Sequence, residues 1–466
     1  VYNKPESNAT QWSLMSYLAR INYTLKHKYL FSVNARVDGS SRFGTNNKYG
    51  FFPSASAGWR ISEEAFMEPV KEVISNLKLR ASYGFTGNTE IGVYESLATL
   101  GTSNWILGNQ LVSGFFPNKI PNPDLKWERT GQFDIGLDLG LFNNRLRITT
   151  DYYKKKTTDL LYSVAVPATS GYQTMLKNIG SIENQGYELS IESDNLTGAF
   201  SWTTAFNIAF NRNKVLELGG EEYKEMAEGD GHLKTGSVRR LIVGEPIGVF
   251  YGYRFDGIFQ NEEECKQQTS SASPIGVGLR RYKDLNGDGK VDAANDREIL
   301  GDANPKFFGG LTNTFAYKGF ELNVFLQYSY GNKILNYNAM ELENPTGGQN
   351  AYADMVNRWT PENPSNIYPK ATTNRALLVS DRFIEDGSYL KLKTLSLSYS
   401  FPKINLKHIQ GLRLYVTGQN LLTWTKYRGY DPEVSYRGAS TLEAGEDFGG
   451  YPQSRTFMFG IKLDIK

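Results

Sequence analysis

Long stretches of strict apolar–polar alternation, with aromatic residues on the apolar face, constrain the fold of this chain more than any other feature. In residues 132–141, 201–210 and 320–330, nearly every second residue is apolar. Successive side chains of a strand point to opposite faces, so each stretch would separate an apolar from a polar environment. Strands in soluble sheets are usually about 5–6 residues long, whereas a tilted strand needs about 9–11 residues to cross a bilayer. These lengths predict the wall of an all-β transmembrane antiparallel β-barrel.

The composition agrees with a barrel and excludes several other classes. The 466 residues include 29 Tyr, 26 Phe and 46 Gly at a mean hydropathy of −0.45, and no uninterrupted apolar run is long enough for a membrane-spanning helix. Only the outer face of a barrel must be apolar, so a barrel fits a sequence of ordinary polarity. A net charge of +2 argues against a nucleic-acid surface. The single Cys265 cannot form an internal disulfide.

About thirteen wall strands can be placed along the chain, with short and long connections alternating between them. The connection at residues 62–75 is longer than the other turns on its side, and we expect it to contain a short helix at residues 63–73. The predicted strands are residues 12–23, 28–38, 51–61, 76–86, 126–141, 144–154, 186–193, 200–212, 306–317, 319–331, 389–401, 412–423 and 455–466.

Barrels of this class have short periplasmic turns and long extracellular loops. That rule places the C-terminus in the periplasm and residue 1 outside the cell. Bacterial single-chain barrels have an even number of strands, so we expect residues 1–466 to be the C-terminal part of a larger barrel domain, with its first strands absent. No signal peptide stands at Val1, in keeping with that expectation. The alternative is a missed wall strand, for instance residues 249–259, which we assign to a hairpin in a loop.

A series of short motifs, in order along nearly the whole chain, resembles the SusC/RagA family of TonB-linked outer-membrane transporters. The motifs are DGSSRFG at 38–44, FPS at 52–54, GWR at 58–60, LKLRASYG at 77–84, GN at 87–88, NPDLKWE at 122–128, NQGYE at 184–188, the stretch 284–301 with NPK at 304–306, YLKL at 389–392, GQNL at 418–421 and YDPE at 430–433.

The resemblance implies a barrel of about 22 strands whose lumen is filled by a plug. It also implies import of a glycan, oligosaccharide or peptide, together with a SusD-like surface lipoprotein that caps the extracellular mouth. TonB–ExbB–ExbD would supply the energy through the absent plug and N-terminal segment. The resemblance is compatible with a dimer of transporter–lid pairs in outer-membrane lipid.

One segment resembles a calcium loop, within the long extracellular loop of residues 213–305. Asp284, Asn286, Asp288, Lys290 and Asp292 fit the start of an EF-hand-type loop, with Lys290 giving its backbone carbonyl and Gly289 making the turn. The twelfth position, where Glu is usual, is Asn295, and Asp296 follows it. A bound calcium ion would order the loop. The alternative reading of residues 284–296 is an Asx-rich surface turn without metal. We expect no other cofactor.

Catalytic motifs are absent from the sequence. His27, His232 and His408 are far apart, and neither HExxH, GxSxG nor a P-loop occurs. We expect acidic pairs such as Glu221-Glu222 to lie on the solvated surface of loops. We therefore expect that the protein is not an enzyme.

The aromatic residues near strand ends and those in loops each have two possible interpretations. Those near strand ends would form the interfacial girdle of a barrel or stack sugar rings; they are Tyr152, Tyr153, Tyr328, Tyr330, Trp424 and Tyr427. Aromatic residues within loops are candidates for ligand or partner contact, or for packing inside the loops; they are Trp105, Phe115, Phe116 and Tyr251.

The leading hypothesis is therefore active import of a nutrient across the outer membrane, with residues 213–305 and 332–388 holding the ligand or hinging the lid. The alternative is a passive pore, or a surface or assembly scaffold, without energy coupling. The same wall would serve each of them, so the pattern of strands alone does not choose.

Overall fold

The computed structural model describes residues 7, 9–226, 229, 231–233, 235–344, 350–373, 377–401, 409–438, 440 and 442–465. The chain divides into two compact units. The first comprises residues 1–187 and 213–222, and the second comprises residues 188–212 and 223–466.

Thirteen long strands form one antiparallel sheet in the described part of the chain, and adjacent strands in the sheet are also consecutive among the thirteen along the sequence. They are β1 (Leu14–Leu25), β2 (Tyr29–Ser40), β3 (Tyr49–Arg60), β4 (Ile74–Asn88), β7 (Glu128–Leu141), β8 (Leu146–Thr158), β11 (Ser181–Thr197), β12 (Phe200–Glu217), β21 (Phe307–Tyr317), β22 (Phe320–Tyr330), β25 (Tyr389–Ser400), β26 (Ile409–Thr425) and β28 (Thr456–Ile465).

All thirteen predicted wall strands are confirmed, most of them within two or three residues at each end. The largest difference is β11, predicted at residues 186–193, which has 17 residues, and β12 has 18. The first part of β11 is largely polar and lacks the apolar alternation, so the alternation pattern does not predict that the strand begins before residue 186. Strands of this length exceed the bilayer span and continue into the long-loop region.

The predicted alternation of short and long connections is confirmed within each unit. Three residues, Lys26–Lys28, join β1 to β2, and the first two have φ of 51° and 59°; Lys318 and Gly319 join β21 to β22 with φ of 45° and 89°. At Lys318–Gly319 the two consecutive positive φ values give a two-residue hairpin turn, which matches the twist of the flanking strands.

The connection between β3 and β4 differs from the prediction of one short helix at residues 63–73. It contains two 3-10 helices, η1 (Ile61–Glu63) and η2 (Ala65–Val70). Glu64 separates them with extended backbone, and its carboxylate accepts hydrogen bonds from Tyr29 Oη at 2.6 Å and Lys28 Nζ at 3.0 Å. These contacts to the end of the neighbouring strand interrupt the helical run.

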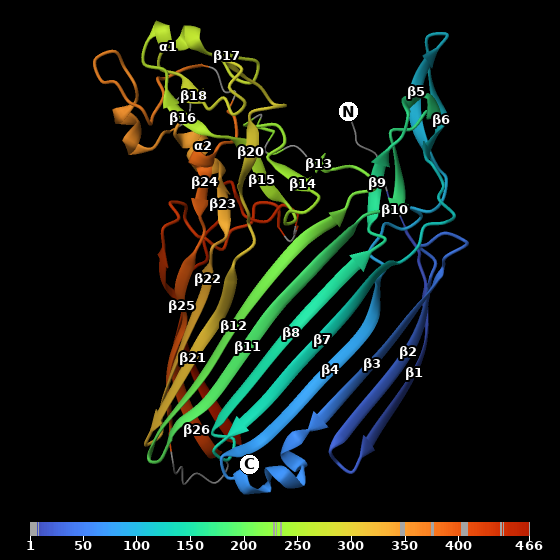
Figure 1. Ribbon diagram of the computed structural model, residues 1–466. Helices are drawn as coiled ribbons and strands as arrows, with labels where there is room; N and C mark the ends of the chain where they lie inside the picture. Colours follow the sequence, from blue (N-terminus) through green and yellow to red (C-terminus); the bar gives the residue numbers. More distant parts are fainter. Residues whose placement is uncertain are drawn as a thin grey trace. The chain divides into compact units, whose positions relative to one another are not determined.

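The long loops carry their own small elements. In the first unit these are the hairpins β5 (Thr99–Leu107) with β6 (Gln110–Lys119) and β9 (Leu161–Ala165) with β10 (Thr174–Asn178), and η3 (Ala168–Ser170). Figure 1 shows the β5–β6 hairpin beyond the end of β4 that lies opposite η1 and η2.

In the second unit, small sheets and short helices gather beyond one end of β21, β22 and β25 (Figure 1). They are β13 (Tyr223–Glu225), β14 (Arg239–Ile242), β15 (Val249–Tyr253), β16 (Phe255–Ile258), α1 (Glu262–Gln267), β17 (Thr269–Ser270), β18 (Arg280–Tyr282), β19 (Lys290–Val291), β20 (Arg297–Gly301), β23 (Lys333–Asn336), α2 (Tyr337–Leu342), η4 (Ala353–Asn357), η5 (Asp381–Phe383), β24 (Ile384–Asp386) and β27 (Glu446–Asp447).

Residues 249–259 lie in these loop sheets and not in the wall, as predicted, but they do not form a hairpin. β15 pairs with β14 and β20, whereas β16 pairs with β18. Arg254 separates β15 from β16 and forms ion pairs with Glu298 and Asp381. Each of the two strands therefore finds its partner elsewhere in the loop.

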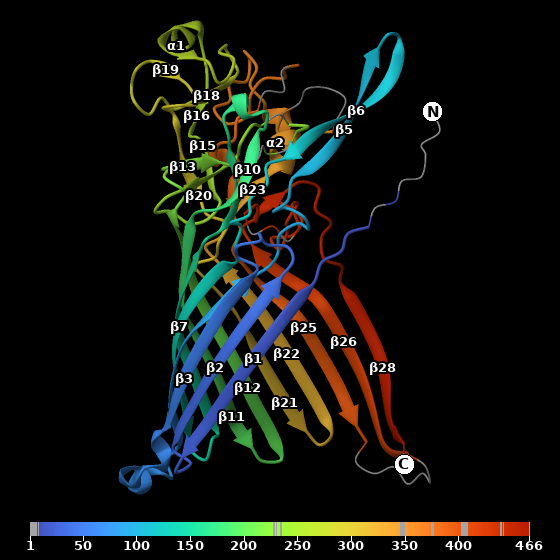
Figure 2. The same cartoon turned by 90° about the vertical axis from the view of Figure 1, so that its right-hand side faces the viewer.

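The buried apolar clusters lie in the loop regions, with Phe52 of β3 as a contribution from the wall, whereas the wall strands expose apolar side chains on alternate positions. In β28, Phe457, Phe459 and Ile461 are 63%, 80% and 68% exposed. Figure 2 shows β28 beside β26, with which it pairs. Such a face suits contact with lipid. Among the described residues, no helix has the length and apolarity needed to cross a membrane.

Replacing Ile461 with Arg should destabilise the wall by about 2–4 kcal/mol, because the charge would lie on the lipid-facing side near the middle of β28. Urea unfolding of the protein in lipid bilayers measures this. Lys462→Gln, at the adjacent position on the opposite face, is the matched control and should change stability by less than about 0.5 kcal/mol. Equal effects of the two substitutions would contradict the assignment of faces.

Candidate functional site

A root cluster of Phe43, Phe52, Leu125 and Trp127 joins two long loops of the first unit where they leave the wall. The ring of Trp127 lies 4.9 Å from that of Phe43 and 5.4 Å from that of Phe52, measured between centroids. Trp127 Nε1 donates to the carbonyl of Lys48 at 3.1 Å. The DGSSRFG and NPDLKWE motifs are therefore packed against each other.

Two motif glycines make this packing possible. A Cβ on Gly44 would lie 2.0 Å from the carbonyl oxygen of Pro123, and one on Gly87 would lie 2.2 Å from the ring of Phe52. The amide of Gly44 also donates to the carbonyl of Leu125 at 3.0 Å. Glycine is required at residue 44 because the other loop's backbone occupies the space of a side chain.

Gly44→Ala should therefore separate the two loop roots, at a cost of about 1–3 kcal/mol or more, since backbone has to move. The readout is faster hydrogen exchange in residues 41–48 and 120–127, measured by mass spectrometry on the intact protein. Gly198→Ala is the control, because nothing lies within 4 Å of a Cβ there. Unchanged exchange in Gly44→Ala would show that the packing is dispensable.

A buried ion cluster joins the YLKL and YDPE motifs in the second unit. Lys391 is 1% exposed, and its Nζ lies 2.7 Å from Asp431 Oδ1 and 2.5 Å from Glu433 Oε2. Lys393 Nζ lies 2.9 Å from the same oxygen of Glu433, and Tyr389 Oη donates to Glu433 at 3.1 Å. The cluster ties the loop after β26 to the start of β25.

The charges of this cluster make it sensitive to acid. Burial, the largest single cause, would raise the pKa of Asp431 and Glu433, but the hydrogen bonds from Lys391 together with those from backbone amides or Lys393 outweigh it, and the pKa of each carboxyl lies below its ordinary value. A carboxyl with a depressed folded-state pKa stabilises the fold above its unfolded pKa of about 4, and this stabilisation is lost as pH falls further.

Lys391→Met should destabilise the attachment of residues 426–438 to β25 by about 3–5 kcal/mol, because it leaves two buried carboxylates without their shared cation. Hydrogen exchange of those residues measures the change. In wild type, the protection factors of these amides, which correct for the intrinsic pH dependence of exchange, should fall only as pH drops below about 4, and the variant should have lost most of this dependence. Lys462→Met, which removes an exposed ion pair, should have no measurable effect.

The calcium-like segment forms a loop of Asx turns held by its own carboxylates. Asp284 accepts hydrogen bonds from the amides of Gly287 and Gly289, each at 2.7 Å. Asp288 accepts from the amide of Lys290 at 2.8 Å, and Lys290 Nζ lies 3.0 Å from Asp292. The hydrogen bond from Lys290 is the main cause that lowers the pKa of Asp292.

Asp296, rather than a Glu at the twelfth position, closes this loop. It is fully buried and accepts hydrogen bonds from the amides of Leu285 at 2.8 Å and Asp292 at 2.7 Å. Across the described residues, no three His, Cys, Asp or Glu side chains are grouped so as to hold a metal ion. Calcium binding by Asp284, Asn286, Asp288, Lys290 and Asp292 stays a prediction, and the side-chain hydrogen bonds account for the turn by themselves.

Three loop aromatics lie on the β5–β6 hairpin. Trp105 is 60% exposed, Phe115 72% and Phe116 43%. Residues 99–118 contain no charged side chain, and the exposed side chains of this hairpin, whose backbone is seen in Figure 2, are neutral and largely apolar. It is therefore a candidate for contact with a partner.

Other aromatic residues divide between packing and exposure. Tyr251 packs between the guanidinium groups of Arg240 and Arg297, which supports its packing role. Tyr427 fits neither the girdle nor a sugar platform, because it is 5% exposed and its hydroxyl donates to Asp447. Trp424 is 51% exposed, which both a place in the aromatic girdle and the stacking of a sugar ring require.

The histidines are not brought together in the described structure. His27 lies in the turn between β1 and β2, and Nε2 of His232 lies 3.5 Å from Glu341. His408 lies outside the described residues.

Sequence reasoning missed a group of buried charges in the loops of the second unit. Arg239 and Glu446 form an ion pair at 2.8 Å with both side chains 2% exposed. Glu343 is fully buried between Arg382 and Arg428. These partners are separated by tens to hundreds of residues and belong to no local motif, so no spacing in the sequence signals them.

Comparison with known proteins also indicates a TonB-dependent receptor barrel, over nearly the whole chain. The family model described as "TonB dependent receptor-like, beta-barrel" matches residues 1–421. "TonB-dependent receptor P3" of Formosa agariphila is 41% identical over 467 residues, which cover 99% of this chain and 46% of that protein. "TonB-dependent receptor SusC" of Bacteroides thetaiotaomicron is 32% identical over 476 residues, covering 98% and 44%.

Solved structures agree with these relatives. The "Structure of the RagAB peptide transporter" matches with a TM-score of 0.82 and 28% identity, over 97% of this chain and 47% of that one. The chain thus spans about half the length of the proteins it matches. The resemblance to SusC and RagA found in the sequence motifs is confirmed.

Proposed function

Because the chain belongs to the TonB dependent receptor-like β-barrel family of the outer membrane, with SusC among its relatives, we propose that it forms part of a TonB-dependent importer of an oligosaccharide or peptide. The observation that carries the proposal is the combination of a thirteen-stranded wall that exposes apolar side chains with long, internally packed loops at one end of the strands. A wall of this kind crosses lipid, and ordered loops offer surfaces for capture.

The packing of the loops supports capture of a defined ligand. The root cluster and the Lys391 cluster fix loop segments to the strands from which they emerge. Side chains on such a scaffold are held in place before ligand binds, which reduces the entropic cost of binding. A pore with loops that only border an opening has no need of buried ion clusters in them.

A SusD-like surface lipoprotein is the partner we propose for the extracellular side. The β5–β6 hairpin supports this, since its exposed Trp105 and Phe115 suit an apolar protein contact better than contact with water. TonB–ExbB–ExbD would supply the energy for transport, as in the family. A passive pore or a scaffold remains the second candidate, because it would use the same wall.

Uptake of a labelled oligosaccharide or peptide by cells producing the intact protein should be abolished when TonB is deleted. Candidate ligands are those on which the producing organism grows only when this gene is intact. A plasmid copy of TonB should restore uptake. Uptake that persists without TonB, together with steady ion conductance of the purified protein in planar bilayers, would contradict the importer and favour the passive pore.

A further inference from the structure

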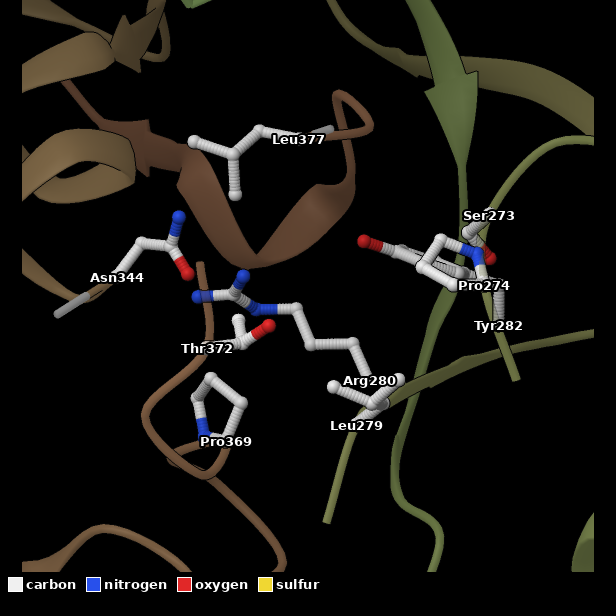
Figure 3. Close-up of a pocket in the computed structure, with 9 residues that line it drawn as sticks. All are labelled: Ser273, Pro274, Leu279, Arg280, Tyr282, Asn344, Pro369, Thr372 and Leu377. Carbon is white, nitrogen blue, oxygen red and sulfur yellow. The ribbon is translucent and has the colours of Figure 1, made fainter. Parts of the chain in front are cut away.

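A cavity lies between the two long loops of the second unit that the sequence predicts to hold ligand. The space inside it for water-sized molecules is about 40 Å³, and the empty space is about 390 Å³ when the opening to solvent is included. Ser273, Leu279, Arg280 and Tyr282 line it from residues 213–305, and Asn344, Thr372 and Leu377 line it from residues 332–388. Figure 3 shows the Arg280 guanidinium pointing between Asn344 and Thr372, with Leu377 on the facing segment.

Arg280 is a buried cation that forms no ion pair with a carboxylate among the residues that the structure describes. It is 9% exposed, and within the described chain its hydrogen bond is from Nη2 to the backbone carbonyl of Glu343, at 3.1 Å. Its Nε is buried and has no hydrogen-bond partner among the described residues. The adjacent Arg281 is different, because it forms ion pairs with Asp256 and Glu264.

The carboxylate of Glu343, whose backbone carbonyl accepts from Arg280, is already neutralised by other cations. Oε2 of Glu343 accepts hydrogen bonds from Arg382 at 2.6 and 2.9 Å, and Oε1 accepts from Arg428 at 2.8 Å. Arg428 also pairs with Glu385 at 2.7 Å. Among these described side chains, Arg382 and Arg428 are paired with the two glutamates, and Arg280, which lines the cavity, is the arginine without a carboxylate partner.

Burial of an unpaired cation is unfavourable. Desolvation lowers the pKa of the Arg280 guanidinium, although arginine keeps its charge in proteins. The ring of Phe383, with its centroid 5.5 Å from the guanidinium carbon, offers only weak compensation. An oxyanion in the cavity would satisfy both the charge and the free N–H, since the planar guanidinium matches carboxylate and sulfate geometry.

We propose that the cavity around Arg280 binds a single carboxylate or sulfate-type oxyanion carried by the imported ligand. The inference rests on the proposed function and narrows its substrate class to acidic ligands. Two sources share this chemistry, the free terminal carboxylate of a peptide and an acidic sugar of an oligosaccharide. Both loops contact the cavity, so an anion bound there would hold the two loops together.

The test is fluorine NMR of trifluoroacetate added to the intact protein, purified in detergent, with neutral trifluoroacetamide as the matched probe. Trifluoroacetate should show saturable line broadening, and trifluoroacetamide should show none. Arg280→Met should weaken trifluoroacetate binding by about tenfold or more, which is the loss of a charge-assisted contact. Arg281→Met, one residue away on the same strand, should bind as wild type does.

Further arms cover misfolding and the source of the anion. If Arg280→Met fails to fold, Arg280→Lys keeps the charge without the planar fork and should still weaken binding. Displacement by a short peptide but not by its C-terminally amidated form indicates a peptide. Displacement by glucuronate but not by glucose indicates an acidic sugar.

Absence of saturable broadening in wild type, or equal binding in Arg280→Met and wild type, would overturn the proposal and leave a water-filled cavity. Because the NMR measurement needs no TonB, a failure of the proposed anion site can be distinguished from a failure of the proposed transport function. Anion binding without TonB-dependent uptake would refute the proposed transport and leave the site, whereas uptake without anion binding would refute the site alone.

Discussion

Backbone hydrogen bonding between neighbouring strands is the constraint on which the rest of this structure depends. In lipid, every amide and carbonyl of a spanning strand needs a protein partner, and an antiparallel ladder supplies one on each side. The order of the thirteen strands follows the chain, with short turns such as Lys318–Gly319 alternating with long loops as the connections between neighbouring strands. One face of each strand can then be apolar and the other polar without any buried core between them.

The loops are ordered by other interactions, because they extend beyond the wall and lack its ladder of backbone hydrogen bonds. They use two kinds of interaction near the strand ends. In the first unit aromatic packing around Trp127 joins loop roots, and Gly44 lets two backbones approach closely. In the second unit Lys391 joins Asp431 and Glu433. Several of the motifs that carry the family resemblance, among them DGSSRFG, NPDLKWE, YLKL and YDPE, thus have a structural role, because they attach loops to strands.

The charged residues of the loops show how far sequence patterns reach. The YLKL and YDPE motifs were recognisable, but their contact through Lys391 was not, because about 40 residues separate them. Arg280, which has no carboxylate partner among the described residues, belongs to none of the motifs, and in the sequence Arg280 and Arg281 look like an ordinary pair of surface cations. Only burial and the identity of the neighbours distinguish the two, with Arg281 joined to Asp256 and Arg280 facing a cavity. The Asp284–Asp292 pattern was easy to see, yet the structure explains its turn by hydrogen bonds to backbone amides.

The sequence by itself determined the strands, their order and the alternation of short and long connections, because these depend on local periodicity and turn residues such as Lys318 and Gly319. It did not determine the length of β11, the two 3-10 helices around Glu64 or the separate partners of β15 and β16. Those features depend on contacts between residues far apart in the chain. Tertiary structure alone decided which charges are buried and which are paired, because desolvation acts on position in space and leaves no period in the sequence.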